Sequence, residues 1–212
     1  MISIRKFVFN TFMVNTYLLY DETGAGLIVD AACYEAREQD ELSAFIAGNG
    51  IRLERNINTH CHVDHVLGNN FVAETWGIRP EFHEKSLPFF DILHEVGSSF
   101  GYLVGKVPEP VRFLDDGETI RWGNSSLEVL YTPGHAEGSV CLYSPAQGFV
   151  ITGDVLFRDT IGRTDLPSGN LDQLLTAIRD RLFTLPDKTV VLPGHGPETT
   201  IGYEKMNNPF VR

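Results

Sequence analysis

The sequence predicts an α+β fold: a four-layer αββα sandwich, with two mixed β-sheets packed face to face and helices outside. Two observations lead to this class. Short runs of β-branched and aromatic residues gather in two halves of the chain, and each half is followed by segments with helical spacing. The 212 residues contain no linker-like tract, so residues 1–212 are expected to form a single domain.

Strands and helices alternate along the first half. Runs rich in β-branched and aromatic residues predict strands, and apolar residues at helical spacing predict helices. The resulting elements are strands 2–9, 15–20, 26–30 and 52–58 and helices 34–47, 68–76 and 85–102. The polar run 21–24 is the turn between the second and third strands, and the glycine-containing run 48–50 ends the first helix.

The second half is richer in short strands. Five are predicted in succession, followed by a helix, a last strand and a closing helix. In chain order these elements are strands 111–114, 118–121, 125–131, 139–144 and 149–152, helix 171–182, strand 190–192 and helix 199–206. Asn170 is suited to cap the first of these helices, because its side chain accepts a hydrogen bond from a backbone amide of the first turn.

Composition argues against several classes of partner. A formal net charge of -11 disfavours nucleic acid and anionic membranes, which both attract basic surfaces. No apolar run approaches the roughly 20 residues of a membrane span, and polar residues interrupt the N-terminal stretch in which a signal peptide would be apolar. The three cysteines are far apart and form no CxxC pair, which indicates a reduced, cytoplasmic protein.

The strongest chemical signal is the segment 59–65, Thr-His-Cys-His-Val-Asp-His, directly after a predicted strand. Alternate side chains of an extended chain share a face, so His60 and His62 can point to one place. Where the chain turns toward a helix, Asp64 and His65 are adjacent and can face a second point nearby. Imidazole and carboxylate groups are ligands for zinc, iron or manganese. The segment therefore predicts a metal site rather than an accidentally His-rich turn.

Three further ligand-type side chains each follow a predicted strand and a glycine, namely His135, Asp154 and His195. The glycine lets the backbone turn closely, and strand-end loops on one edge of a sandwich converge on one place. Each residue alone is more typical of a turn than of a ligand. Together with the segment 59–65, the three favour one shared metal site.

This pattern, His-x-His-x-Asp-His followed by Gly-His, Gly-Asp and Gly-His, resembles the metallo-β-lactamase superfamily. It is most similar to the single-domain relatives of glyoxalase II, the hydroxyacylglutathione hydrolases. Residues 162–165, Gly-Arg-Thr-Asp, and the tail segments 199–205 and 208–210 are similar to the same branch, so the resemblance spans nearly the whole chain. It implies the αββα metallo-β-lactamase sandwich and two divalent metal ions, zinc first, with iron or manganese as alternatives.

The resemblance also implies a ligand set and a reaction. The seven motif residues divide between two metals, the first taking His60, His62 and His135, the second Asp64, His65 and His195, with Asp154 bridging both. The implied reaction is hydrolysis: a hydroxide that bridges the metals attacks a thioester such as S-lactoylglutathione, or a related ester. Asp64 and Asp154 would orient the hydroxide, and a thiolate leaves with little help from a general acid.

Other functions fit the same scaffold. Persulfide dioxygenases resemble it and bind one iron through two His and one Asp, so the ligand residues alone do not separate the two classes. The Gly-His-Gly-Pro segment 194–197 looks more like the hydrolases. A lactonase, a phosphodiesterase and a catalytically silent scaffold are further alternatives, and the intact ligand set argues against the last. The expected partner is a small thioester or ester.

Three residues are weaker candidates for substrate contact, namely Arg163, Tyr102 and Lys205. For Arg163, an ion pair with Asp165 that holds the loop is the competing interpretation. Tyr102 ends an aromatic-rich stretch that either lines an apolar substrate mouth or packs as an ordinary helix. No motif within residues 82–110 indicates the role of that segment. Cys61, between two ligand candidates, is expected to point away from them.

Overall fold

The chain forms two compact units in the computed structural model, which describes residues 1–105 and 107–211. The first unit comprises Met1–Phe113 and Arg121–Ser125, and the second comprises Leu114–Ile120 and Ser126–Arg212. Each contains strands of a six-stranded β-sheet. Four of the predicted metal ligands belong to the first unit and three to the second. The single-domain organisation of residues 1–212 stays a prediction.

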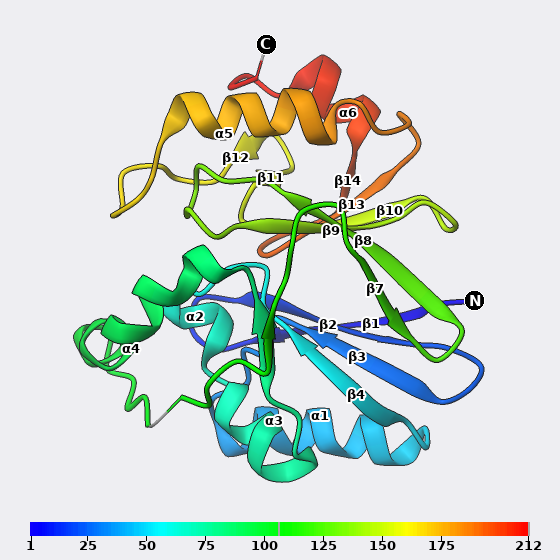
Figure 1. Cartoon of the computed structure of the whole chain (residues 1–212), viewed down its shortest axis with the longest axis vertical. Helices are drawn as coiled ribbons and strands as arrows, with labels where there is room; N and C mark the ends of the chain where they lie inside the picture. The colour runs from blue at the N-terminus through cyan, green and yellow to red at the C-terminus, as the bar shows by residue number, and fades with distance from the viewer. Residues whose placement is uncertain (106, 212) are drawn as a thin grey trace. The chain divides into compact units, whose positions relative to one another are not determined.

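The sheet of the first unit is mixed (Figure 1). Across the sheet its strands follow chain order: β1 (Ser3–Phe9), β2 (Val14–Tyr20), β3 (Ala25–Val29), β4 (Arg52–Ile57), β5 (Pro80–Phe82) and β6 (Arg112–Phe113). The first three pair antiparallel, and β3 to β6 pair in parallel. The hairpin turn between β2 and β3 contains Gly24 at φ +76°, a backbone conformation that favours glycine.

Several helical elements belong to the first unit. They are α1 (Ala36–Gly48), α2 (Val63–Val66), α3 (Asn69–Trp76), the 3₁₀ turn η1 (Glu84–Ser86) and α4 (Leu87–Ser99). Figure 1 shows α1 and α3 on the same face of the sheet. Leu42 and Ile46 of α1 and Val72 of α3 share one apolar core with Leu18 and Ile28 of the strands. Leu53 of β4, the strand that precedes the ligand-bearing turn, belongs to the same core.

The sheet of the second unit is also mixed. Its strand order is β14 (Thr199–Thr200), β13 (Val190–Pro193), β10 (Phe149–Gly153), β9 (Val140–Ser144), β8 (Ser125–Tyr131) and β7 (Thr119–Trp122). The central pair, β10 and β13, is parallel, whereas β8, β9 and β10 pair antiparallel. A separate two-stranded hairpin is formed by β11 (Leu156–Phe157) and β12 (Thr160–Ile161). Parallel pairing of β10 and β13 brings the carboxyl ends of both strands to one edge.

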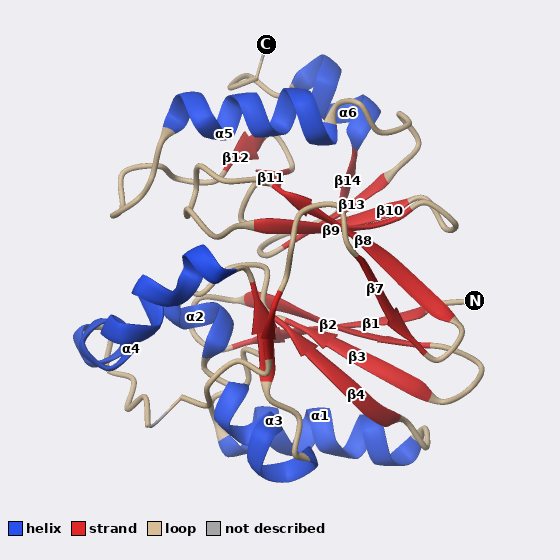
Figure 2. Ribbon diagram, in the orientation of Figure 1, coloured by secondary structure: helices blue, strands red, loops and turns tan. Residues whose placement is uncertain are grey.

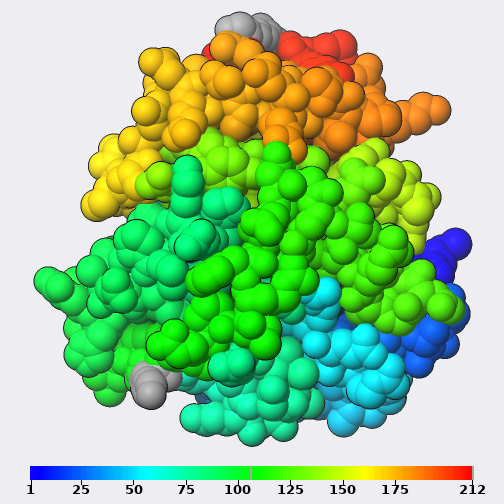
Figure 3. Space-filling model, viewed as in Figure 1, coloured from blue at the N-terminus to red at the C-terminus, as the bar shows by residue number. Residues whose placement is uncertain are grey.

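Two helical segments lie on one face of this second sheet (Figure 2). The helix α5 (Leu171–Ala177) continues into the π-helical turn η2 (Ile178–Leu182), and α6 (Ile201–Asn207) follows β14. Leu174 and Ile178 pack with Val150 and Val191 of the central strands, and Ile201 of α6 joins the same core. The space-filling view in Figure 3 shows α6 beside the α5–η2 segment at the surface.

The predicted fold class is confirmed: the chain is α+β, with two mixed sheets flanked by helices. The predicted cap of α5 is also present, because Asn170 Oδ1 accepts a hydrogen bond from the Gln173 amide at 3.0 Å. In the described residues, no helix combines the length and the apolar character that crossing a membrane requires.

The structure differs from the predicted elements mainly where pairing is short. β5 spans three residues and begins with proline, and β11 and β12 span two residues each, so none has enough alternation to be recognised. The predicted helix 85–102 begins with a 3₁₀ turn, and α4 ends at Ser99, close to Gly101 at φ +83°. The first two residues of the predicted helix 199–206 pair with β13 as β14.

Candidate metal centre

The first group of ligand candidates lies where β4 runs into α2. The connection is short, and its last residue, His62, is still extended at ψ 149° before the helix begins. The ring centroids of His60 and His62 are 4.7 Å apart, and those of His60 and His65 are 4.2 Å apart. The Oδ2 atom of Asp64 lies 3.6 Å from Nε2 of His65. The first unit thus brings its four predicted ligands together.

Asp30, which no sequence pattern marks as functional, contacts residues of this group through its carboxylate. It follows β3, is buried, and has a φ of +51°. Its Oδ1 accepts a hydrogen bond from the Thr59 amide at 2.7 Å, and its Oδ2 accepts one from Thr59 Oγ1 at 2.7 Å. The same Oδ2 lies 3.0 Å from His65 Nδ1. A carboxylate acceptor at this position places the imidazole proton on Nδ1 and leaves Nε2 with its lone pair.

Side-chain amides fix the backbone of the ligand-bearing turn. Asn58 Nδ2 donates to the His65 carbonyl at 3.2 Å, and Asn69 Nδ2 donates to Asn58 Oδ1 at 2.9 Å. From the β1–β2 turn, Asn10 Nδ2 donates to the Asp64 carbonyl at 2.9 Å. Asn58 and Asn69 are buried, where an unmade hydrogen bond costs about 1–3 kcal/mol. The turn therefore has little freedom to move its ligands.

The second group is assembled from three separate loops. Asp154 follows β10, and His195 follows the neighbouring parallel strand β13. The two strand ends are joined by a hydrogen bond from the Gly194 amide to the Gly153 carbonyl at 2.8 Å. The Oδ2 atom of Asp154 lies 3.6 Å from Nε2 of His135 and 3.5 Å from Nε2 of His195. One carboxylate oxygen therefore faces both imidazoles.

Close backbone approaches hold these loops in place. Gly134 has a φ of +128°, and a Cβ atom at this position would lie 2.3 Å from the Leu174 amide nitrogen of α5. A Cβ at Gly162 would lie 1.9 Å from the Asp154 carbonyl oxygen. The loop after β12 also supplies the Arg163 carbonyl oxygen, 2.8 Å from Nδ1 of His135. Glycine is required at both positions because no side chain fits there.

The chemistry of both groups fits divalent cations. The donors are imidazole nitrogens and carboxylate oxygens, which bind zinc and iron. Two of the imidazoles are oriented through their far nitrogen: Nδ1 of His65 faces the Asp30 carboxylate, and Nδ1 of His135 faces a backbone carbonyl. Metal-binding histidines are held in this way, since the partner fixes the tautomer and turns the other nitrogen toward the ion.

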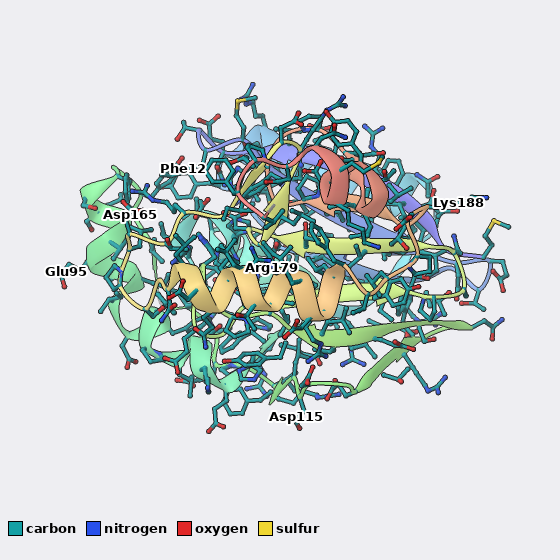
Figure 4. All side chains as sticks on the ribbon, turned by 90° about the horizontal axis from the view of Figure 1, so that it is seen from above. Phe12, Glu95, Asp115, Asp165, Arg179 and Lys188 are labelled. Atoms are coloured by element: carbon teal, nitrogen blue, oxygen red, sulfur yellow. The ribbon has the colours of Figure 1, made fainter. Side chains whose placement is uncertain are left out.

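The three predicted substrate contacts all have other partners in the structure, beginning with Arg163 and Tyr102. The guanidinium of Arg163 forms two hydrogen bonds with the Asp165 carboxylate, at 2.8 and 2.7 Å, so the ion pair in the loop is present. Figure 4 shows Asp165 at the periphery, in agreement with its exposed side chain. The hydroxyl of Tyr102 is 2.5 Å from Thr11 Oγ1, and its buried ring lies edge-on to that of Tyr34 at 4.7 Å. Substrate contact by either residue stays a prediction.

The third candidate, Lys205, pairs with an acidic side chain, and Cys61 is buried. The ammonium group of Lys205 is 2.6 Å from Asp187 Oδ1. Asp187 precedes β13 whereas His195 follows it, so Lys205 sits at the opposite end of that strand, and its contact with substrate also stays a prediction. Cys61 is fully buried, and burial raises the pKa of its thiol well above the usual value.

Comparison with known proteins identifies the family. The family model of the metallo-β-lactamase superfamily matches residues 10–195. The chain is 34% identical over 211 residues to the hydroxyacylglutathione hydrolase GloC of Haemophilus influenzae, covering 94% of this chain and 93% of that protein.

Two solved structures have the same fold over nearly their whole length. A B3 metallo-β-lactamase, BLEG-1, superposes with a TM-score of 0.89 at 29% identity, covering 99% of both chains. TTHA1623, solved in a di-iron-bound form, superposes with a TM-score of 0.87 at 32% identity, covering 97% of this chain and 99% of the other. These likenesses and the His/Asp groups indicate a metal-dependent hydrolase that binds divalent metal ions. The chain belongs to the metallo-β-lactamase superfamily.

Proposed function

We propose that this protein is a binuclear metal-dependent thioesterase that hydrolyses a hydroxyacylglutathione-type thioester such as S-lactoylglutathione. The observation that carries the proposal is the position of Asp154. Its Oδ2 lies 3.6 Å from one imidazole nitrogen and 3.5 Å from another, on loops that follow different strands. A carboxylate oxygen that faces two imidazoles, each expected to bind a different ion, is suited to bridge two ions. The likeness to a hydroxyacylglutathione hydrolase at 34% identity supports the substrate class.

The proposed ligand set joins the two groups. His60, His62 and His135 would hold one ion, and Asp64, His65 and His195 would hold the other. Asp154 would contact both. Zinc is the first expectation because imidazole and carboxylate ligands suit it, and iron or manganese would bind the same donors.

The reaction divides between the ions and the protein. When bound, two divalent ions lower the pKa of a water molecule toward about 7 and polarise a carbonyl. The carboxylates of Asp64 and Asp154 would orient the attacking water by accepting its hydrogen bonds. Asp30 would keep the proton of His65 on Nδ1, so that its Nε2 stays a ligand. A thiol leaving group has a pKa of about 8.5, so the protein needs no strong general acid to release it.

Turnover of S-lactoylglutathione by protein purified without chelators tests this proposal. We expect thioester cleavage that is lost after metal removal and returns when zinc is added back. The same preparation is assayed separately with a β-lactam and with glutathione persulfide, the latter in an oxygen electrode. Oxygen uptake with the persulfide and no thioester cleavage would assign the protein to the dioxygenases, and β-lactam cleavage alone would remove the thioesterase proposal.

A further inference from the structure

Helix α6 carries a buried acidic group that the proposed chemistry does not use. Glu204 is fully buried, and its carboxylate accepts hydrogen bonds from three partners. Thr199 Oγ1 donates to its Oε1 at 2.5 Å, and Asn208 Nδ2 and the Asp159 amide donate to its Oε2 at 2.8 and 3.1 Å. This carboxylate therefore joins α6 to β14 and to the β11–β12 turn.

The turn between β11 and β12 is held at several points by α6 and the residue that follows it. Besides the bond to Glu204, the Tyr203 hydroxyl donates to Asp159 Oδ1 at 2.8 Å. Asn208 Nδ2 donates to the Thr160 carbonyl at 3.0 Å. Asp159 has a φ of +61°, a backbone conformation that a non-glycine residue adopts only at some cost in free energy. The contacts with α6 offset this cost and fix the turn.

The other end of the same hairpin adjoins the metal-ligand group. β11 begins two residues after Asp154, and Thr152 Oγ1 donates to the Leu156 carbonyl at 2.9 Å. The ring centroid of Phe157 lies 6.3 Å from that of His195. The hairpin thus lies against both Asp154 and His195 while α6 fixes its turn.

We propose that Glu204 is a positioning residue for the metal site: through the β11–β12 hairpin it fixes Asp154 and His195 in the orientation that binds the second ion. The inference rests on the proposed function, in which these two residues are ligands. Packed side chains and hydrogen bonds transmit such an effect only where the elements are in continuous contact, and here each link is a direct contact. Groups that orient ligands without touching the ion change metal affinity by about 10–100-fold.

Zinc titration of metal-depleted protein against a chromophoric chelator tests the inference without using activity. The decisive variant is Glu204→Ala, which removes the acceptor for all three donors. Glu204→Gln is the conservative rescue, because its carbonyl oxygen can face Asp159 and Asn208 while its amide donates to the rotatable Thr199 hydroxyl. Asp187→Asn is the matched control: it also loses a carboxylate that contacts α6, but at the Lys205 end of β13.

We expect Glu204→Ala to lower the affinity for the second zinc ion by about 10–100-fold and the affinity for the first ion by less. Glu204→Gln should recover part of this affinity, and Asp187→Asn should bind both ions like the parent. Tyr203→Phe, which deletes a single hydroxyl, should also lower the affinity for the second zinc ion, by a smaller factor. Parent-like binding of both ions in Glu204→Ala, or equal weakening of both, would overturn the inference. If Glu204→Ala does not fold, parent-like binding in Tyr203→Phe overturns it. A parent protein that binds fewer than two ions contradicts the proposed function instead, whatever the variants do.

Discussion

The two groups of metal-ligand candidates are built in different ways. In the first unit, four side chains come from one stretch of six residues, His60 to His65, and buried amides and Asp30 fix the turn that carries them. In the second unit, three side chains come from loops far apart in sequence, and strand pairing and glycine contacts bring them together. The first group is therefore encoded locally, whereas the second depends on the topology of a sheet.

This difference predicts how each group responds to mutation. A change in the first group should act through the buried hydrogen bonds around one turn. A change in the second should act through the loop or hairpin that presents the ligand.

Loss of Asp154 is expected to have the largest effect. Asp154→Ala removes a carboxylate whose Oδ2 faces both His135 and His195. We expect kcat/KM for S-lactoylglutathione to fall by more than about 100-fold, since a direct ligand matters more than the outer groups that cost 10–100-fold. Steady-state kinetics on zinc-reconstituted protein measure this. A fall of less than tenfold would remove Asp154 from the proposed ligand set.

Asp30→Asn probes the first group without removing a ligand. The amide of asparagine can accept the hydrogen bond from the Thr59 amide, but its NH₂ group then meets the Nδ1–H of His65. We expect zinc affinity to fall by about 10–100-fold while the protein stays folded. Equilibrium competition with a chelator is the measurement, and unchanged affinity would mean that Asp30 only supports the backbone.

Asp21 provides the matched control for Asp30. It is also a buried carboxylate at the end of a strand in the first unit, but its partners are Thr23, Asn124 and Ser125 rather than a ligand. Asp21→Asn should therefore lower the free energy of unfolding and leave zinc affinity unchanged. A loss of zinc affinity equal to that of Asp30→Asn would show that any buried defect in this unit reaches the metal site.

Asp21 also makes stability depend on pH. Desolvation by burial raises the pKa of this carboxyl, but hydrogen bonds from Thr23, Ser125 and Asn124 outweigh it and lower the pKa to about 2. The unfolded-state value is higher, about 3.9, so the ionised form stabilises the fold above about pH 4. This stabilisation is lost as the pH falls from about 4 through about 2. The difference in unfolding free energy between parent and Asp21→Asn should shrink over that window, and a constant difference would contradict the assignment.

Arg163→Met should have the smallest effect. The guanidinium lies in an ion pair with Asp165 that solvent screens because both side chains are exposed, and His135 is oriented by the Arg163 backbone carbonyl. We expect parent-like zinc affinity and a KM change of less than about threefold. A tenfold rise in KM at unchanged kcat would instead establish the substrate contact that the sequence suggested for this arginine.

The same contrast explains how much could be predicted from the sequence. The first group stands out because four ligand-type residues lie within one short segment. The second group is indicated by a short pattern that occurs three times, in which a strand is followed by a glycine and a ligand-type residue. Each occurrence is local, so it can be read even though the three loops are far apart in the sequence. The α+β class followed from the grouping of strands and helices, and the cap at Asn170 from its residue type.

What the sequence did not show depends on partners that are distant in the chain. Asp30 meets His65 35 residues later, and Asp159 meets Glu204 45 residues later, so no local pattern links either pair. The strands β5, β11 and β12 have two or three residues, and they exist because neighbouring strands supply their hydrogen bonds. Their assignment requires the register of a sheet, which periodicity alone does not give.

Metal stoichiometry is the most direct test of the proposal that the chain binds two divalent ions. Elemental analysis of protein purified without chelators, with the chain concentration measured on the same sample, gives the number of ions per chain. We expect roughly two zinc, iron or manganese ions per chain, and one fewer after Asp154→Ala. A single iron ion per chain, with no second ion bound after zinc is added, would contradict the binuclear proposal.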